Sequence, residues 1–112
     1  MRVTVWNAAF GVWKSFLDIT DEEVHKALEV NIRAAFAFSR LSILAFKGNG
    51  IDEVGKRGAL IFTGATASWR GNTTTSTFAA GKFGLRALSQ SLNKEFGKDN
   101  IHVSYMHCVY RV

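Results

Sequence analysis

The sequence has little cysteine and no long apolar run, and both absences narrow the class of protein. Cys108 is the single cysteine among 112 residues, so no disulfide can form within the chain, and we expect a reducing, cytoplasmic compartment. No apolar run approaches the roughly 18 residues that a membrane-spanning helix needs, so we expect no membrane association. The first residues, MRVTVWNAAF, are interrupted by Asn7 and predict a strand rather than a signal peptide.

Several functional motifs are also missing. The chain contains neither G-x-G-x-x-G nor G-x-x-x-x-G-K-[ST], the glycine-rich patterns that hold phosphates. Its three histidines have no metal-ligand spacing with Cys108 or the carboxylates, so we predict no metal site. The net charge of +5 comes from scattered basic residues without a nucleic-acid-binding signature. A solvated basic surface explains this charge better than a polyanion-binding site does, and we expect no nucleic-acid partner.

What the sequence does contain is an alternation of strands and long helices. A composition that is 47% hydrophobic and 21% charged indicates a globular chain of one domain at most. The apolar runs predict three strands, over Arg2–Trp6, Gly58–Thr63 and Ile101–Met106. Between them, the periodic segments predict helices over Thr20–Lys47 and Thr75–Phe96. This βαβαβ order indicates an α/β fold with parallel strands joined by right-handed crossovers.

Local signals fix the ends and the buried faces of both helices. Thr20 and Glu23 have the spacing of a capping box, and Gly48 ends the first helix. We expect the buried faces to be formed by Val24, Leu28, Ala35, Phe38 and Ala45 in the first helix, and by Leu85, Leu88, Leu92 and Phe96 in the second. Right-handed crossovers place both helices on one face of the sheet. The other face should therefore be bare, unless a further segment or an associated chain covers it.

The parallel topology gathers three polar segments at one edge of the sheet. Ligands in such folds bind beyond the carboxyl ends of the strands. This edge receives residues 7–9, the small-residue loop of residues 63–73 and the segment from His107 onward. The second helix begins at the same edge, so Phe78 and Lys82 should lie close to it.

Two polar residues on apolar faces are candidates for chemistry. Asn31 falls within the apolar stripe of the first helix, where its amide could bond a neighbouring loop or belong to a site. Lys82 follows Phe78 by four residues on one helix face. Its ammonium could extend to solvent, or it could bind a polar ligand and lower the pKa of a nearby hydroxyl.

Taken together, these segments resemble the carboxyl-terminal part of the short-chain dehydrogenase/reductase family over nearly the whole chain. The resemblance rests on Asn7-Ala8-Ala9, Val30-Asn31, Leu60–Ser68 (LIFTGATAS), Phe78-x-x-x-Lys82 and Asn100–Val103, which are similar to the family's motifs in order and spacing. It implies a partial Rossmann-like three-layer fold in a single domain over residues 1–112. It further implies an NAD(P)-dependent oxidoreductase that acts on a small carbonyl or alcohol substrate.

The resemblance also implies the roles of individual residues. Asn31, Ser68, Phe78 and Lys82 are similar to the catalytic positions, and Asn7, Ala8, Thr63 and Lys82 to the positions that hold NAD or NADP. The family's tyrosine is replaced by Phe78, which cannot act as a general acid or base. Ala65 stands at the family's usual serine spacing, thirteen residues before Phe78, so Thr66 or Ser68 would have to substitute.

Two further departures bear on function. His107–Tyr110 stands where the family has a P-G turn, and the family's first three strands, which include the glycine-rich cofactor loop, have no counterpart in the chain. We therefore expect a truncated or catalytically impaired member in which cofactor binding is weak or lost. The alternative is a non-catalytic scaffold or dimerisation module, because the family's two long helices pair between subunits into homo- or hetero-oligomers.

Overall fold

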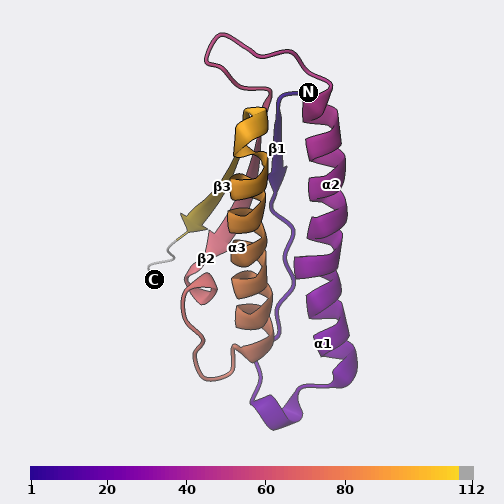
Figure 1. The fold of residues 1–112 in the computed structure, drawn as a ribbon. Coiled ribbons are helices and arrows are strands. Elements are labelled where there is room, and N and C mark those ends of the chain that lie inside the picture. Colours follow the sequence, from indigo (N-terminus) through magenta and orange to yellow (C-terminus); the bar gives the residue numbers. More distant parts are fainter. Residues whose placement is uncertain (109–112) are drawn as a thin grey trace.

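Three parallel strands and two long helical segments make up the protein in the computed structural model, which describes residues 1–108 (Figure 1). The strands are β1 (Val3–Trp6), β2 (Gly58–Ala65) and β3 (Ile101–Cys108). They form one sheet in the order β1-β2-β3, with Val5 opposite Ile61 and Ile61 opposite Ser104. The predicted α/β fold with parallel βαβαβ order is confirmed. Val109 and Tyr110, which stand in place of the P-G turn, lie outside the described residues.

The first helical segment contains a wide turn that the sequence did not predict. It consists of α1 (Asp21–Leu28), the π-helical turn η2 (Glu29–Arg33) and α2 (Ala34–Lys47), after a 3₁₀ turn η1 (Phe16–Asp18). In η2 the amide of Ala34 donates to the carbonyl of Glu29, five residues earlier. π-helical turns inside α-helices are found frequently at functional sites, and Asn31 lies at the centre of this one.

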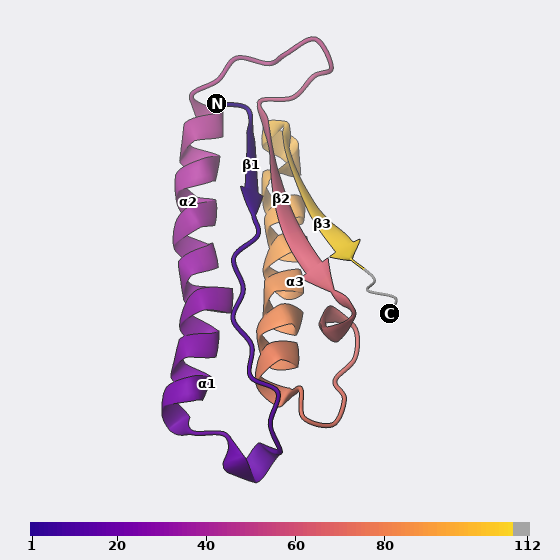
Figure 2. The same ribbon diagram turned by 180° about the vertical axis from the view of Figure 1, so that it is seen from behind.

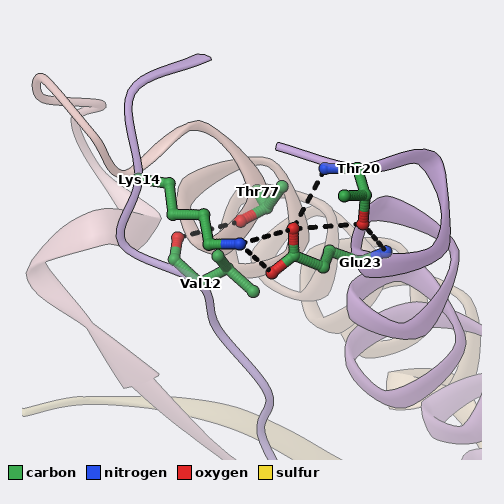
Figure 3. Close-up of polar contacts among 5 residues, drawn as sticks. All are labelled: Val12, Lys14, Thr20, Glu23 and Thr77. Atoms are coloured by element: carbon green, nitrogen blue, oxygen red, sulfur yellow. Dashed lines mark hydrogen bonds and ion pairs between the residues drawn. The ribbon is translucent and has the colours of Figure 1, made fainter. Parts of the chain in front are cut away.

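The predicted capping box at the start of α1 is confirmed. The hydroxyl oxygen of Thr20 accepts from the Glu23 amide at 3.1 Å, and the Glu23 carboxylate accepts from the Thr20 amide at 3.0 Å (Figure 3). The second long helix, α3 (Ser76–Phe96), also follows its prediction to within one residue. It is preceded by the 3₁₀ turn η3 (Thr66–Ser68) and followed by η4 (Gly97–Asp99).

Both helical segments cover the same face of the sheet, as Figures 1 and 2 show from opposite sides. The core between them contains Phe46 of α2, Leu60 and Phe62 of β2, and Leu85 of α3, all fully buried. On the opposite face, Val3 and Val5 of β1 are 57% and 49% exposed. The described residues thus supply the sheet and one helical layer of a Rossmann-like fold, and the predicted bare face is confirmed.

The buried stripe of the first helical segment differs from the prediction. Ala35 is buried as expected, but Val24, Leu28 and Ala45 are exposed. Asn31 is buried and Phe38 packs against the core, as expected, whereas other buried side chains, which include Ala27, Ser42 and Phe46, lie outside the predicted stripe. The reason is that this segment has two apolar faces, and periodicity alone does not tell which of them meets the sheet. For α3 the prediction is confirmed, because Leu85 and Leu88 are buried and Leu92 and Phe96 pack against the core.

Candidate functional site

Lys82 is a buried cation at the carboxyl edge of the sheet. It is 3% exposed, so its ammonium does not extend to solvent, and this alternative is excluded. The ammonium donates to the carbonyl oxygen of Thr63 in β2 at 3.1 Å. It also lies 5.7 Å from the centre of the Phe78 ring, within the range of a cation–π contact. The predicted proximity of Phe78, Lys82 and the end of β2 is therefore confirmed.

The segment that follows β1 forms an aromatic wall beside these residues. The Trp13 and Phe78 rings lie 5.2 Å apart between their centres. Gly11 allows this approach, because a Cβ atom there would lie 2.6 Å from the Phe78 ring. Asn7 and Ala8, which come directly after β1, are exposed. The side of Phe78 that faces this segment is therefore apolar.

Polar contacts fasten the same segment to the first turns of α1 and α3 (Figure 3). The Thr77 hydroxyl donates to the Val12 carbonyl at 3.2 Å, and the Lys14 amide donates to the Thr74 carbonyl at 3.2 Å. The Lys14 ammonium pairs with the Glu23 carboxylate at 2.9 Å. The hydrogen bond from Lys14 lowers the pKa of Glu23, and the Thr20 amide adds to this effect.

Asn31 joins this segment to the π-helical turn. Its side-chain nitrogen donates to the carbonyl oxygens of Phe10 at 2.7 Å and of Ala27 at 2.8 Å. Asn31 is fully buried, and its side-chain oxygen has no hydrogen-bond partner among the described residues. Gly81 of α3 packs on it so closely that a Cβ there would lie 2.8 Å from the Asn31 Cβ. The amide nitrogen thus bonds a loop, while the oxygen is an unused buried acceptor.

Ser68 lies on the other side of the strand end and is also fully buried. Its hydroxyl oxygen accepts from the Ala65 amide at 3.1 Å, and the hydroxyl also forms a hydrogen bond with the Tyr105 hydroxyl. Burial raises the pKa of Tyr105 above its ordinary value, although the hydrogen bond from Ser68 opposes this shift. The structure places Ser68 against Tyr105, and its predicted catalytic role stays a prediction.

Tyr105 is a residue of the site region that the sequence analysis missed. The signal was present in β3, because strand alternation puts Tyr105 on the same face as the buried Ile101 and Val103. Phe62 lies opposite Tyr105 in the register, and Gly64, two residues further along β2, leaves room for the phenol ring, since a Cβ there would lie 2.0 Å from a ring carbon. A glycine in β2 near a tyrosine in β3 is a size-matched pair, but only the strand register reveals it.

A separate apolar recess of about 660 Å³ lies between the starts of α1 and α3. It is lined mostly by apolar side chains, namely Phe16, Leu17, Ile19, Val24, Ala27, Leu28 and Ala80, with Asp21, Ser76 and Thr77. Asn31, Phe78 and Lys82 are not among its lining residues. The recess is therefore distinct from the lysine-centred site.

Comparisons with known proteins identify the family. The profile of the short chain dehydrogenase family matches residues 1–110. A short-chain dehydrogenase/reductase of Armillaria gallica is 36% identical over 106 residues, which are 93% of this chain and 38% of that protein. The chain belongs to the short-chain dehydrogenase/reductase family.

Solved structures agree with this assignment. A short-chain dehydrogenase from Rhodopseudomonas palustris is 37% identical, with a TM-score of 0.84 and coverage of 95% of this chain and 47% of that one. The 3-ketoacyl-(acyl-carrier-protein) reductase from Brucella melitensis, complexed with NADH, shares the fold with a TM-score of 0.87 at 22% identity. It is covered to 44%, and this chain to 96%. The chain thus spans less than half the length of each of these relatives.

In this member of the family, the residue beside the Lys82 ammonium is Phe78, which has no hydroxyl. Ala65 ends β2, and Ser68 follows it in η3, three residues further on.

Within residues 1–108, no group of three or more histidine, cysteine, aspartate or glutamate side chains could hold a metal ion. No helix in that range is long and apolar enough to cross a membrane.

Proposed function

We propose that the protein is an NAD(P)-dependent oxidoreductase of the short-chain family, acting on a small carbonyl or alcohol substrate, whose catalysis is impaired. The observation that carries this proposal is the buried Lys82 ammonium, held between the Thr63 carbonyl and the Phe78 ring at the carboxyl edge of the sheet. Family membership and the matching fold support it. In this proposal residues 1–112 form a single partial Rossmann-like domain in the cytoplasm.

The residues at this edge fit a nicotinamide cofactor in part. Lys82 supplies a cation for the ribose hydroxyls, and Asn7, Ala8 and Thr63 lie where the strands end. The buried oxygen of Asn31 is an acceptor that could hold a water molecule. When bound, NAD or NADP supplies the hydride chemistry, and the Brucella melitensis neighbour carries NADH. We expect a dissociation constant no better than about 0.1 mM for NADH, because no glycine-rich loop holds the pyrophosphate.

Proton transfer is the step that this chain performs poorly in our proposal. Phe78 has no group that can give or take a proton, and an apolar wall formed by Trp13 faces its ring. Lys82 can hold the cofactor, but its ammonium does not replace a phenol at position 78. A positioned acid–base group contributes about 10²- to 10⁴-fold to a rate. We therefore expect little or no turnover by the chain as it stands.

The direct test compares the wild-type chain with Phe78→Tyr and with Phe78→Tyr combined with Lys82→Met. NADH and NADPH oxidation is followed by absorbance with a panel of ketones and aldehydes, and binding is measured by calorimetry. We expect Phe78→Tyr to raise the rate by about 10²-fold or more, and Lys82→Met to abolish the gain. Micromolar NADH binding by the wild type would contradict the predicted weak binding. No gain in Phe78→Tyr, despite native circular dichroism, would contradict an otherwise intact site.

A second candidate function is favoured by the apolar recess between α1 and α3. Leu17 and Leu28 at this recess are 91% and 45% exposed, which is unusual for a surface that stays in water. We propose that the helices associate with a second subunit there, so that the chain serves as a scaffold or dimerisation module. Sedimentation of wild type and Leu28→Glu separates the two candidates. A monomeric wild type would contradict the proposed scaffold or dimerisation module. Turnover of a carbonyl substrate by the wild type would contradict a purely structural role.

A further inference from the structure

Tyr105 lies where three elements of the fold meet. It belongs to β3, its hydroxyl bonds Ser68 in η3, and the same hydroxyl lies 3.4 Å from the backbone carbonyl of Lys82 in α3. Ser68 in turn accepts from the amide of Ala65, the last residue of β2. A single side chain therefore connects the end of β2, the loop after it and the helix that carries the candidate lysine.

The hydrogen bonds of this cluster can all be satisfied in one direction. The Lys82 carbonyl can only accept, so the Tyr105 hydroxyl donates to it. The oxygen of Tyr105 then accepts from the Ser68 hydroxyl, and the oxygen of Ser68 accepts from the Ala65 amide. The phenol is a protonated donor at neutral pH even at its ordinary pKa of 10.0, and burial raises the pKa of Tyr105 further. Such a chain of buried hydrogen bonds has no unpaired hydroxyl, which favours one arrangement of the loop.

The small residues of the loop are explained by this cluster as well. Small side chains in a loop can let a ligand approach the backbone, or they can make room for another part of the chain. In the structure, Gly64 admits the Tyr105 ring, because a Cβ would lie 2.0 Å from one ring carbon and 2.7 Å from the phenol oxygen. The loop is therefore shaped by a neighbouring strand of the same chain.

A second contact fastens the same loop to the same helix from outside. The Arg86 guanidinium of α3 lies 3.5 Å from the centre of the Trp69 ring. The His107 ring of β3 meets that ring edge-on at 5.9 Å between centres. The loop is thus held against α3 and β3 by two sets of contacts. The hydroxyl cluster lies in the interior, and the contacts of the Trp69 ring lie at the surface.

We propose that Tyr105 and Ser68 are positioning residues for the lysine-centred site, and that Ser68 acts through this role rather than on a substrate. Both ends of Lys82 are involved, because its carbonyl meets Tyr105 while its ammonium meets the Thr63 carbonyl just before the loop. The hydroxyl cluster fixes the distance between α3 and the end of β2. It therefore also fixes the position of the Lys82 ammonium beside the Thr63 carbonyl. This inference rests on the proposed function, because the position of Lys82 matters only if Lys82 binds a cofactor. Its test, however, needs no cofactor.

The test uses the full 112-residue chain with Tyr105→Phe, Ser68→Ala and the double variant. Ser39→Ala is the matched control, because the Ser39 hydroxyl is also buried but has no partner among the described residues. Amide hydrogen exchange is measured for residues 65–70 and for the strands. Reductive methylation of Lys82 is measured against that of the exposed Lys94.

Positioning gives a pattern that general destabilisation does not. We expect each single variant to speed exchange at residues 65–70 and methylation of Lys82 by about 5- to 30-fold, while exchange in the strands stays within twofold. The effect of the double variant should be smaller than the two single effects combined, because both variants break the Ser68–Tyr105 bond and each removes only one further bond of its own. The control should leave both rates unchanged.

Two outcomes would overturn the proposal. One is an equal rise of exchange in loop and strands, which would mean that the hydroxyls serve overall stability. The other is loop exchange and Lys82 methylation within twofold of the wild type. Neither outcome depends on NADH binding, so failure of the proposed function would be seen separately, in calorimetric titration of the wild type.

Discussion

Replacing Gly81 by alanine tests whether the packing of α3 on Asn31 holds the site together. In a helix, this change alone should stabilise the protein by about 0.8–1.0 kcal/mol, because alanine is the better helix former. In the structure, however, the new Cβ would lie 2.8 Å from the Asn31 Cβ, 3.0 Å from its Cγ and 3.1 Å from its side-chain nitrogen. Asn31 therefore has to move, and it is held by two hydrogen bonds.

The magnitude follows from three terms. Overpacking of a buried contact costs about 1–3 kcal/mol. Weakening the bonds from Asn31 to the Phe10 and Ala27 carbonyls costs about 1 kcal/mol for each bond that is lost. The gain in helix propensity offsets about 1 kcal/mol of this cost. With one of these two bonds lost, its cost and the gain in helix propensity cancel, and we expect Gly81→Ala to lower the free energy of unfolding by about 1–3 kcal/mol.

Gly84→Ala is the matched control, three residues along the same helix. Its new Cβ would meet the Cδ1 of Ile32 at 2.5 Å and the Cγ1 at 3.6 Å. The close contact is therefore with the end of a flexible side chain, which can rotate away. The same propensity gain applies, so we expect a change within about 1 kcal/mol of zero.

The assay is urea unfolding of the three proteins, followed by far-ultraviolet circular dichroism and tryptophan fluorescence. Repeating the comparison in an Asn31→Ala background should reduce the cost of Gly81→Ala, because the contacts with Cγ and the side-chain nitrogen disappear and no hydrogen bond of Asn31 is left to weaken, although the contact with the Cβ remains. The reasoning is refuted if Gly81→Ala is as stable as Gly84→Ala. It is equally refuted if the cost is the same with and without the Asn31 amide.

Two further predictions concern the segment that precedes α3 and the contacts that fasten it. Thr74 has a backbone φ of 68°, which a β-branched residue adopts at a cost, so Thr74→Gly should raise the free energy of unfolding by about 0.5–1 kcal/mol, whereas Thr73→Gly should not. The pKa of Glu23 is lowered from its ordinary 4.5 by Lys14, so its contribution to stability is present above pH 4.5 and lost as the pH falls through the folded-state pKa. The difference in unfolding free energy between wild type and Glu23→Gln should therefore shrink in acid, and a difference that persists at pH 2 would contradict it.

The features that sequence could predict are those set by neighbouring residues. The capping box of Thr20 and Glu23 and the order of strands and helices are local patterns of spacing and periodicity. The gathering of Thr63, Phe78 and Lys82 at one edge follows from the parallel topology, which brings the carboxyl ends of the strands and the start of α3 together. These predictions needed no knowledge of how side chains pack.

The features that sequence did not predict depend on contacts between distant residues. The π-helical turn forms where the Asn31 side chain bonds Phe10, 21 residues away. Tyr105 bonds Ser68 across 37 residues, a contact that depends on how the turn after β2 lies against β3. The exposure of Val24 and Leu28 was missed because the helical segment has a second apolar face, which lines a recess.

In the proposed function, Phe78 and Lys82 form a site in which a buried cation has no acid–base neighbour at position 78. A buried ammonium is costly unless polar or aromatic groups surround it. The Phe78 ring contributes a π face 5.7 Å from the ammonium, an attraction that needs no hydroxyl. Phenylalanine therefore removes the proton-transfer group while keeping part of the environment that stabilises the cation. Stability of the lysine and catalysis by its neighbour are thus separable in this fold, so an intact lysine site does not by itself indicate an active enzyme.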